Sequence, residues 1–199
     1  MKVIGITGGI GSGKSTILNI LKDTYNAFVI STDHIAHILM EKGNISYNLI
    51  VENFGSGILD QEGNINRKKL GAIVYNNPEK LLLLNSLSHP YVMKHVIDII
   101  EEKRKEKVAL ICVETALPKE AGLSNFCDEI WYIHTSENIR RERLQTSRNY
   151  TNEKIDTIFY NQIKENEYRK ISTHIIDNNL SREKVAEQIA QILKNIPGK

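Results

Sequence analysis

The stretch that decides the fold reads Gly8-Gly9-Ile10-Gly11-Ser12-Gly13-Lys14-Ser15-Thr16, directly after an apolar run at 2–7 and directly before a helical pattern at 17–22. It matches the pattern G-x-x-x-x-G-K-[ST] in the strand, loop and helix order of a phosphate-binding loop. The glycines let successive backbone N–H groups face one phosphate, and the N-terminus of the helix adds about half a positive charge. A glycine-rich turn without a ligand would need neither Lys14 nor Ser15, so the stretch predicts nucleotide binding.

Each residue of this loop has an expected role toward ATP and Mg²⁺. Lys14 is expected to bridge the β- and γ-phosphates and to take part in catalysis. Ser15 is expected to bind Mg²⁺ through its hydroxyl, because magnesium takes hard oxygen ligands and shares its shell with nucleotide phosphates. Thr16 can add a contact to the α-phosphate. The predicted nucleotide contacts in the loop are Gly9, Ile10, Gly11, Ser12, Gly13, Lys14, Ser15 and Thr16.

An α/β fold follows from the alternation of short apolar runs with longer helical patterns. Runs that are apolar on both faces are typical of parallel strands buried between two helix layers. Asn77, Ser136 and Ser181 are expected to cap three of the helices. A five-stranded parallel sheet is predicted from the runs Lys2–Thr7, Ala27–Ile30, Val108–Val113, Glu129–His134 and His174–Ile176.

The middle of the chain is predicted to be helical. Residues 44–75 carry glycine-rich turns and no strong strand pattern, so they are expected to form a helical insertion beside the sheet. Pro90 is expected to break or kink the helical stretch from Pro78 to about Lys105, because proline lacks an N–H and clashes with the preceding turn. We expect one domain over residues 1–199 and no independently folding parts.

Composition and charge exclude several classes of partner. Lys and Arg number 26 against 24 Asp and Glu, and the net charge of +2 gives no general argument for nucleic acid or an anionic membrane. No apolar run approaches the ~20 residues of a membrane helix, and the start becomes glycine-rich too early for a signal peptide. Cys112 and Cys127 lack the spacing of a metal site or a disulfide framework, so we expect two buried thiols in a cytoplasmic protein.

The residues that accompany the loop favour a small-molecule kinase. The base-reading N-K-x-D segment of a GTPase does not occur, and 199 residues suffice for a phosphate loop, an acceptor site and a lid. Ligands of such sheets lie outside the carboxyl ends of the strands, where two acidic residues follow strand candidates. Asp33 either serves an acceptor hydroxyl or stabilises a helix N-terminus. Glu114 either holds Mg²⁺ or its water, or simply ends a strand.

At these residues the sequence resembles the dephospho-CoA kinases, which use ATP to phosphorylate the ribose 3′-hydroxyl of dephospho-CoA and so complete coenzyme A. The resemblance implies a P-loop kinase fold with a helical acceptor-binding region at 44–105 and a lid at about 136–169. It runs nearly end to end, and its later motifs are more specific than the loop. These motifs are Val29–Ala36, Phe54-Gly55, Asn66–Leu70, Leu87–Pro90, Glu114–Gly122, Asp128 with Ile130, Arg143-Leu144, Gln162 and Ile176–Asn178.

The resemblance also assigns residues to the acceptor side. Asp33 becomes the catalytic base that orients or deprotonates the 3′-hydroxyl. His89 would line the acceptor site, although a core or kink-stabilising histidine explains it equally well. Arg67 could meet an acceptor phosphate, or could belong to a solvated run of charge. Glu114 completes the predicted acceptor-side residues.

On the lid, the resemblance points to Arg143 and Arg148 as catalytic residues, because the planar guanidinium can contact two phosphoryl oxygens at once. Arg140 and Arg141 are expected to be surface residues paired with nearby glutamates, although Arg140 shares a helix face with Arg143. Asn178 is a predicted adenine or ribose contact by resemblance. From its own chemistry it is only a turn residue.

Two departures from the family pattern leave alternatives open. Ser31 stands where the family often has an aspartate, so Asp33 or Glu114 must assist magnesium. Ala116–Glu120 differs from the family's P-L-L-F-E. The alternatives are another small-molecule nucleoside or nucleotide kinase with the same loop, or a nucleotide-binding paralogue without transfer activity. We expect ATP and dephospho-CoA as partners, no nucleic acid or membrane, and a monomer or weak homo-oligomer.

Overall fold

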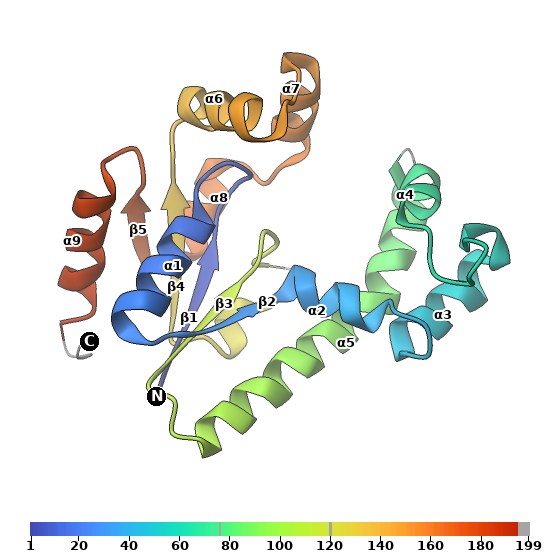
Figure 1. The fold of residues 1–199 in the computed structure, drawn as a ribbon, viewed down its shortest axis with the longest axis horizontal. Helices are drawn as coiled ribbons and strands as arrows, with labels where there is room; N and C mark the ends of the chain where they lie inside the picture. Colours follow the sequence, from blue (N-terminus) through green and yellow to red (C-terminus); the bar gives the residue numbers. More distant parts are fainter. Residues whose placement is uncertain (76, 120, 195–199) are drawn as a thin grey trace. The chain divides into compact units, whose positions relative to one another are not determined.

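The computed structural model describes residues 1–75, 77–119 and 121–194. The chain divides into two compact units, Met1–Ile30 with Lys103–Lys199, and Ser31–Glu102. The first contains the sheet and the phosphate loop, whereas the second is built from helices (Figure 1). Residue 120, at the end of the atypical Ala116–Glu120 segment, lies outside the described residues.

Five strands form one sheet in the order β2-β3-β1-β4-β5. They are β1 (Lys2–Thr7), β2 (Phe28–Ser31), β3 (Leu110–Glu114), β4 (Glu129–His134) and β5 (His174–Asp177). Strand β1 pairs in parallel with β3 and β4, and β4 pairs in parallel with β5. The predicted α/β fold with a five-stranded parallel sheet is confirmed. Because β1 is the central strand, the loop that follows it lies at the middle of the sheet's carboxyl edge.

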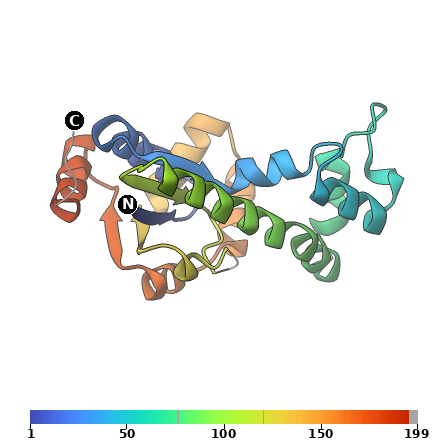
Figure 2. The same cartoon turned by 90° about the horizontal axis from the view of Figure 1, so that it is seen from below.

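Helices cover both faces of the sheet, with α1 and α8 on opposite sides (Figure 2). Helices α1 (Lys14–Tyr25) and α9 (Arg182–Ile192) share an apolar core with Trp131 and Ile133 of β4. Successive strand residues point to opposite faces, so Tyr132 faces the other way. Its ring stacks on Tyr168 of α8 (Glu165–Ile171), with centroids 5.0 Å apart. The strands are therefore buried on both faces, as their uninterrupted apolar character predicts.

Three predicted helix caps have different outcomes. The side chain of Asn77 accepts a bond from Lys80 N at 3.0 Å, and Ser181 Oγ accepts from Lys184 N at 3.4 Å, so both caps are confirmed. Ser136 precedes its helix but makes no side-chain cap bond. Its backbone N–H instead donates to the side chain of Asn179 at 2.8 Å. The elements between β3 and β5, besides α8, are η2 (Leu123–Asn125), α6 (Glu137–Arg148) and α7 (Asn152–Asn161).

The unit Ser31–Glu102 is helical, as predicted for most of its length. A small apolar cluster of Ile50, Ile58, Leu70 and Val74 holds it together. The glycine-rich part contains a single isolated bridge between Leu59 and Ile65 and no named strand among the residues described. Its elements are α2 (Thr32–Leu39), α3 (Ile45–Phe54), η1 (Ser56–Ile58), α4 (Arg67–Tyr75) and most of α5 (Pro78–Lys105).

Helix α5 continues through Pro90, so a break at this proline is wrong, whereas a kink there stays a prediction. Pro90 has no N–H to donate to the carbonyl of Ser86, one turn earlier in the helix. Both residues are exposed and lie on the same side of the helix. Water can therefore bond the released carbonyl, which keeps the cost of the proline low. The helix also buries Val92 and Val96, which hold the segment after Pro90 in place. No helix in the described part of the chain, α5 included, is long and apolar enough to cross a membrane.

The two cysteines are free thiols. Cys112 lies in the core of β3, and Cys127 is partly buried. Burial raises the pKa of both thiols to about 12, so neither is ionised near neutral pH. The expectation of two buried thiols is confirmed fully for Cys112 and in part for Cys127.

Candidate active site

The phosphate loop connects β1 to α1 and has a backbone that only glycine can adopt at two of its positions. Gly11 has φ 76° and Gly13 has φ 86°, both in the left-handed region. A side chain at Gly13 would also collide with the amide of Asn178, and one at Gly11 would press on the backbone of Arg140 at 3.0 Å. The glycines therefore allow both the turn and the close approach of the residues behind it.

Five successive carbonyl groups of the loop accept hydrogen bonds, two from within the loop and three from other parts of the unit. Lys14 Nζ donates to Gly8 O at 2.9 Å, and Ser12 N donates to Gly9 O at 3.1 Å. The next three carbonyls accept bonds from side chains of α6 and of the segments that follow β4 and β5, described below. The amides of Lys14 and Ser15 lie in the first turn of α1, at the end of the helix whose dipole attracts anions. A loop whose carbonyls are already bonded presents N–H groups to an anion.

Two buried side chains hold the carbonyl of Ser12. Asn178 Nδ2 donates to it at 2.7 Å, and Thr135 Oγ1 donates to it at 2.9 Å. All three residues are at most 5% exposed. Asn178, a predicted nucleotide contact, thus directs its amide at the loop itself, because it follows directly after the edge strand β5. Arg143 joins the same cluster through Nη1 to Gly11 O at 3.3 Å and Nη2 to Asn178 O at 3.1 Å.

A cavity of about 810 Å³ opens beside the loop. Its volume lies within the range of about 300–1,000 Å³ that is typical of small-molecule sites. The basic residues Lys14, Arg143 and Arg148 line this cavity together with the acidic residue Glu114. Most of the predicted nucleotide-side residues therefore lie together. Its lining includes Ile10, Gly11, Gly13, Lys14, Ser15, Thr16, Glu114, Glu142, Arg143 and Arg148.

Two buried hydroxyl groups at the loop have no hydrogen-bond partner among the described residues. They are Thr7 Oγ1, at the end of β1, and Ser12 Oγ, inside the loop. A buried hydroxyl without a partner costs free energy, and such groups recur where a ligand completes the bond. With the bonded carbonyls and the cationic cavity, they fit a polar, anionic ligand at this loop.

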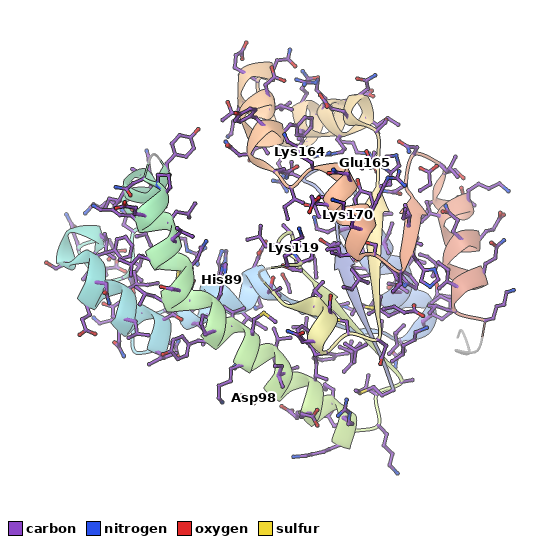
Figure 3. The ribbon with its side chains drawn as sticks, turned by 180° about the vertical axis from the view of Figure 1, so that it is seen from behind. His89, Asp98, Lys119, Lys164, Glu165 and Lys170 are labelled. Atoms are coloured by element: carbon purple, nitrogen blue, oxygen red, sulfur yellow. The ribbon has the colours of Figure 1, made fainter. Side chains whose placement is uncertain are left out.

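The predicted acceptor-side residues, apart from Glu114, belong to the unit Ser31–Glu102. Asp33 is exposed in the first turn of α2, and His89 is partly buried on α5 (Figure 3). Arg67, at the start of α4, donates from Nη1 to Nε2 of His37 at 2.7 Å. Limited burial and the charge of Arg67 lower the pKa of His37, whereas Asp33 raises it. The sequence analysis missed His37. It could have been found from its position four residues after Asp33, which places both side chains on the same face of α2.

Arg140 is not the surface residue that the sequence predicts. Its Nε donates to Ile10 O at 2.9 Å, and its Nη2 donates to Gln162 Oε1 at 2.6 Å. Its guanidinium lies over the ring of Phe159, 4.3 Å from the centroid, and burial lowers its pKa. The available signal was the helix face that Arg140 shares with Arg143. The prediction for Arg141 is confirmed, because it forms exposed ion pairs.

The comparison with protein families decides between the kinase classes. A model described as dephospho-CoA kinase matches residues 2–184. The chain belongs to the dephospho-CoA kinase family. A dephospho-CoA kinase from Carboxydothermus hydrogenoformans is 36% identical over 194 residues, covering 98% of this chain and 94% of the relative. One from Staphylococcus aureus is 35% identical over 196 residues, covering 97% and 92%.

Solved structures place this family member among the P-loop kinases. A crystal structure of a Thermus thermophilus protein matches with a TM-score of 0.82 at 25% identity, covering 99% of this chain and 98% of that one. A dephospho-CoA kinase from Campylobacter jejuni matches with a TM-score of 0.72 at 27% identity, covering 98% of each chain. A shikimate kinase from Acinetobacter baumannii, at 16% identity and a TM-score of 0.55, shares the fold alone. The sequence-based resemblance to dephospho-CoA kinases is confirmed.

Proposed function

We propose that this member of the dephospho-CoA kinase family transfers the γ-phosphoryl group of ATP to the ribose 3′-hydroxyl of dephospho-CoA, giving coenzyme A and ADP. The observation that carries the proposal is the family match over residues 2–184, which spans residues of both compact units. It therefore covers the phosphate loop and the helical region to which the acceptor residues belong. The bonded loop carbonyls and the cationic cavity support the ATP half of the reaction.

Lys14, Arg143 and Arg148 are proposed to bind the phosphates of ATP, with the loop amides and Thr16. This proposal is supported by the position of these residues, which all line one cavity at the N-terminus of α1. Backbone N–H groups and the helix dipole favour anions there. The triphosphate would also give Ser12 Oγ the partner that it lacks within the described chain. Asn178 is proposed to act on this site mainly by holding the loop, since its amide already bonds Ser12 O.

Ser15 and Glu114 are proposed to hold Mg²⁺ together with the nucleotide phosphates. Both line the cavity, and hydroxyl and carboxylate oxygens are the hard ligands that magnesium prefers, so the donor set fits the ion. Bound there, the ion would neutralise charge on the phosphate oxygens. Glu114 follows Val113 at the carboxyl end of β3, where it can bind the ion directly or through water. With Ser31 in place of an acid, this task falls to Glu114 or Asp33.

Asp33 is proposed to orient the acceptor and to take its proton. The 3′-hydroxyl oxygen forms a bond to the γ-phosphorus, the bond from that phosphorus to the β–γ bridging oxygen breaks, and ADP leaves. The hydroxyl proton passes to the carboxylate of Asp33. Asp33 is exposed two residues after the end of β2, at a strand end of the kind where ligands of α/β sheets bind. Arg67 and His89 are proposed acceptor contacts in the same unit.

The segment at about 136–169 is proposed to act as a lid that carries Arg143 and Arg148. Both arginines line the cavity from α6 and can contact oxygens of the transferring phosphoryl group. Closure would exclude water, which would otherwise hydrolyse ATP without an acceptor. The protein is proposed to act in the cytoplasm as a monomer or weak homo-oligomer, on small molecules and not on nucleic acid or membranes.

An acceptor panel tests the function directly. ADP release is measured with dephospho-CoA, with other nucleosides and nucleotides, and with no acceptor, and the phosphorylated product is identified by mass spectrometry. Of the acceptors tested, only dephospho-CoA should give rapid ADP release from ATP. Its product should carry the new phosphate on the ribose 3′-oxygen. Preference for another nucleoside or nucleotide would assign a different kinase activity. Tight ATP binding without turnover on any acceptor would instead assign a nucleotide-binding protein.

Substitutions at both halves of the site test the residue roles. Lys14→Ala should remove most of the activity, because it deletes the cation at the β- and γ-phosphates. Asp33→Asn should lower kcat by about 10²- to 10⁴-fold, the usual contribution of a general base, while ATP binding measured by calorimetry stays nearly unchanged. Asp98→Asn is a matched control, since Asp98 extends from α5 and forms an exposed ion pair with Lys94 (Figure 3). Full activity of both active-site variants would contradict the assigned roles.

A further inference from the structure

The guanidinium of Arg140 joins α6 to the distant phosphate loop and to the end of the next helix, α7. It belongs to α6, bonds the carbonyl of Ile10 in the phosphate loop, and bonds the side chain of Gln162 at the end of α7. It also lies over Phe159 near the end of α7. All these residues belong to the unit that contains the sheet. Arg140 therefore links the loop directly to the end of α7.

The planar guanidinium suits this link better than another cation would. Nε donates in one direction and Nη2 in another, while the flat face remains available to the aromatic ring. A lysine ammonium could not present these fixed directions and the flat face together. Gly9 and Gly11 make the approach possible, because a side chain at Gly9 would meet Arg140 Nη2 and one at Gly11 would meet Arg140 O.

The peptide group that Arg140 bonds adjoins Gly11, which lines the cavity beside the loop. The carbonyl of Ile10 and the N–H of Gly11 belong to the same peptide unit. An anion that accepts a bond from Gly11 N–H polarises this unit and strengthens the bond from Ile10 O to Arg140 Nε, because hydrogen bonds in a chain reinforce one another. Occupancy of the loop thus has a physical means of tightening the contacts of Arg140 with Gln162 and Phe159.

We propose that Arg140 is a positioning residue that couples nucleotide binding at the phosphate loop to the ordering of α7, through Ile10 O and Gln162. This inference rests on the proposed ATP site and extends it to a residue that need not touch the nucleotide. Its consequence is that α7 becomes more rigid when the loop is filled. Helix α6, which carries Arg143 and Arg148, is then held between the loop and a fixed α7.

Arg141 provides a matched control on the same helix. It also connects α6 to α7, through an ion pair with Asp156 at 2.6 Å, and it pairs within α6 with Glu137 at 3.1 Å. Among the described residues, its hydrogen bonds and ion pairs go to α6 and α7 rather than to the loop, and its ion pairs are largely exposed. Removal of Arg141 therefore disturbs the packing of the two helices without removing the proposed link.

The test is hydrogen–deuterium exchange of the whole protein with and without a non-hydrolysable ATP analogue and Mg²⁺. In the unsubstituted protein, the analogue should slow exchange in peptides from α1 and in peptides covering 152–162. The slowing at 152–162 should be about fivefold or more, the lower end of typical coupling between two sites. Arg140→Ala, Arg140→Lys and Gln162→Leu should abolish the slowing at 152–162 and keep the slowing at α1, whereas Arg141→Ala should keep both.

The α1 peptides show whether each variant is folded and binds the analogue, so loss at 152–162 alone identifies lost coupling. Equal slowing at 152–162 in the unsubstituted protein and Arg140→Ala would overturn the inference, as would loss of the effect in Arg141→Ala. Slowing at α1 without any at 152–162 in the unsubstituted protein would overturn it too and leave the ATP site standing. No response in any peptide of the unsubstituted protein would refute the ATP site and the coupling together.

Discussion

The protein should lose little stability when either of the two side-chain donors to the carbonyl of Ser12 is removed, but much more when both are removed. Asn178→Leu removes the donor at 2.7 Å, and Thr135→Val removes the donor at 2.9 Å with little change in volume. Each single substitution leaves one bond to a carbonyl whose residue is 1% exposed. The double substitution leaves that buried carbonyl without either side-chain donor.

The expected magnitudes follow from the bonds that are lost. One buried hydrogen bond contributes roughly 0.5–1.5 kcal/mol net, so each single variant should lower the free energy of unfolding by about 1 kcal/mol. An unsatisfied buried carbonyl adds about 1–3 kcal/mol, so the double variant should lose about 3–5 kcal/mol. The coupling between the two sites is then about 1–3 kcal/mol. For a chain of this size the double variant should melt roughly 6–20 °C lower.

Urea denaturation without nucleotide measures the free energy of unfolding for the four proteins of this double-mutant cycle. Asn178→Leu combined with Ser172→Ala is the control, because Ser172 Oγ bonds Tyr168 O at 2.7 Å and shares no acceptor with Asn178. The control pair should be additive within about 0.5 kcal/mol. Additivity of the Thr135 and Asn178 variants within the same margin would refute the reasoning, since the shared carbonyl would then not depend on both donors.

Two further predictions concern single positions. Gly13→Ala should lower the free energy of unfolding by about 1–2 kcal/mol because of its left-handed backbone alone, and calorimetry should show no ATP binding. Gly57→Ala, with open space around the added carbon, should have neither effect. Equal behaviour of the two variants would argue against the loop geometry. His37 should titrate below its ordinary value of 6.5 by NMR, with Arg67→Ala raising its pKa and Asp33→Asn lowering it further. As pH falls, the imidazole of His37 takes up its proton in the unfolded chain before it does so in the folded protein. The contribution of His37 to stability should therefore be present above pH 6.5 and decline below it. Shifts of the His37 pKa in the opposite directions in the two variants would contradict the contact.

The fold was predictable because its signals are local. An apolar run followed by Gly8–Thr16 and a helical pattern specifies a strand, a loop and a helix within 25 residues. The other strands show the same apolar character on both faces, which only a sheet covered on both sides explains. The expectation of a break at Pro90 was wrong because the effect of a proline on a helix depends on exposure. A proline with its released carbonyl facing water costs much less than a buried one, and a sequence does not show which side faces water.

The candidate site was predictable only where the chemistry lies in side-chain type and spacing. Lys14, Ser15, Glu114, Arg143 and Arg148 could be named because a triphosphate and a metal ion require charged and hydroxyl groups near the loop, and these residues line one cavity. Their roles toward ligands stay predictions.

The side chains that donate hydrogen bonds to the loop carbonyls could not be predicted in the same way. Arg140 and Asn178 bond backbone carbonyls, at separations of 130 and 166 residues. Every residue has a carbonyl, so the acceptor leaves no mark in the sequence, and a donor can be any polar side chain that the sheet brings within 3 Å. Arg140 illustrates this, because helical periodicity places it correctly beside Arg143 yet says nothing of Ile10. A phosphate loop can therefore be recognised from nine residues while the donors that fix its carbonyls, and so its affinity, depend on the assembled sheet. Substitutions at those donors should alter nucleotide binding without changing the motif.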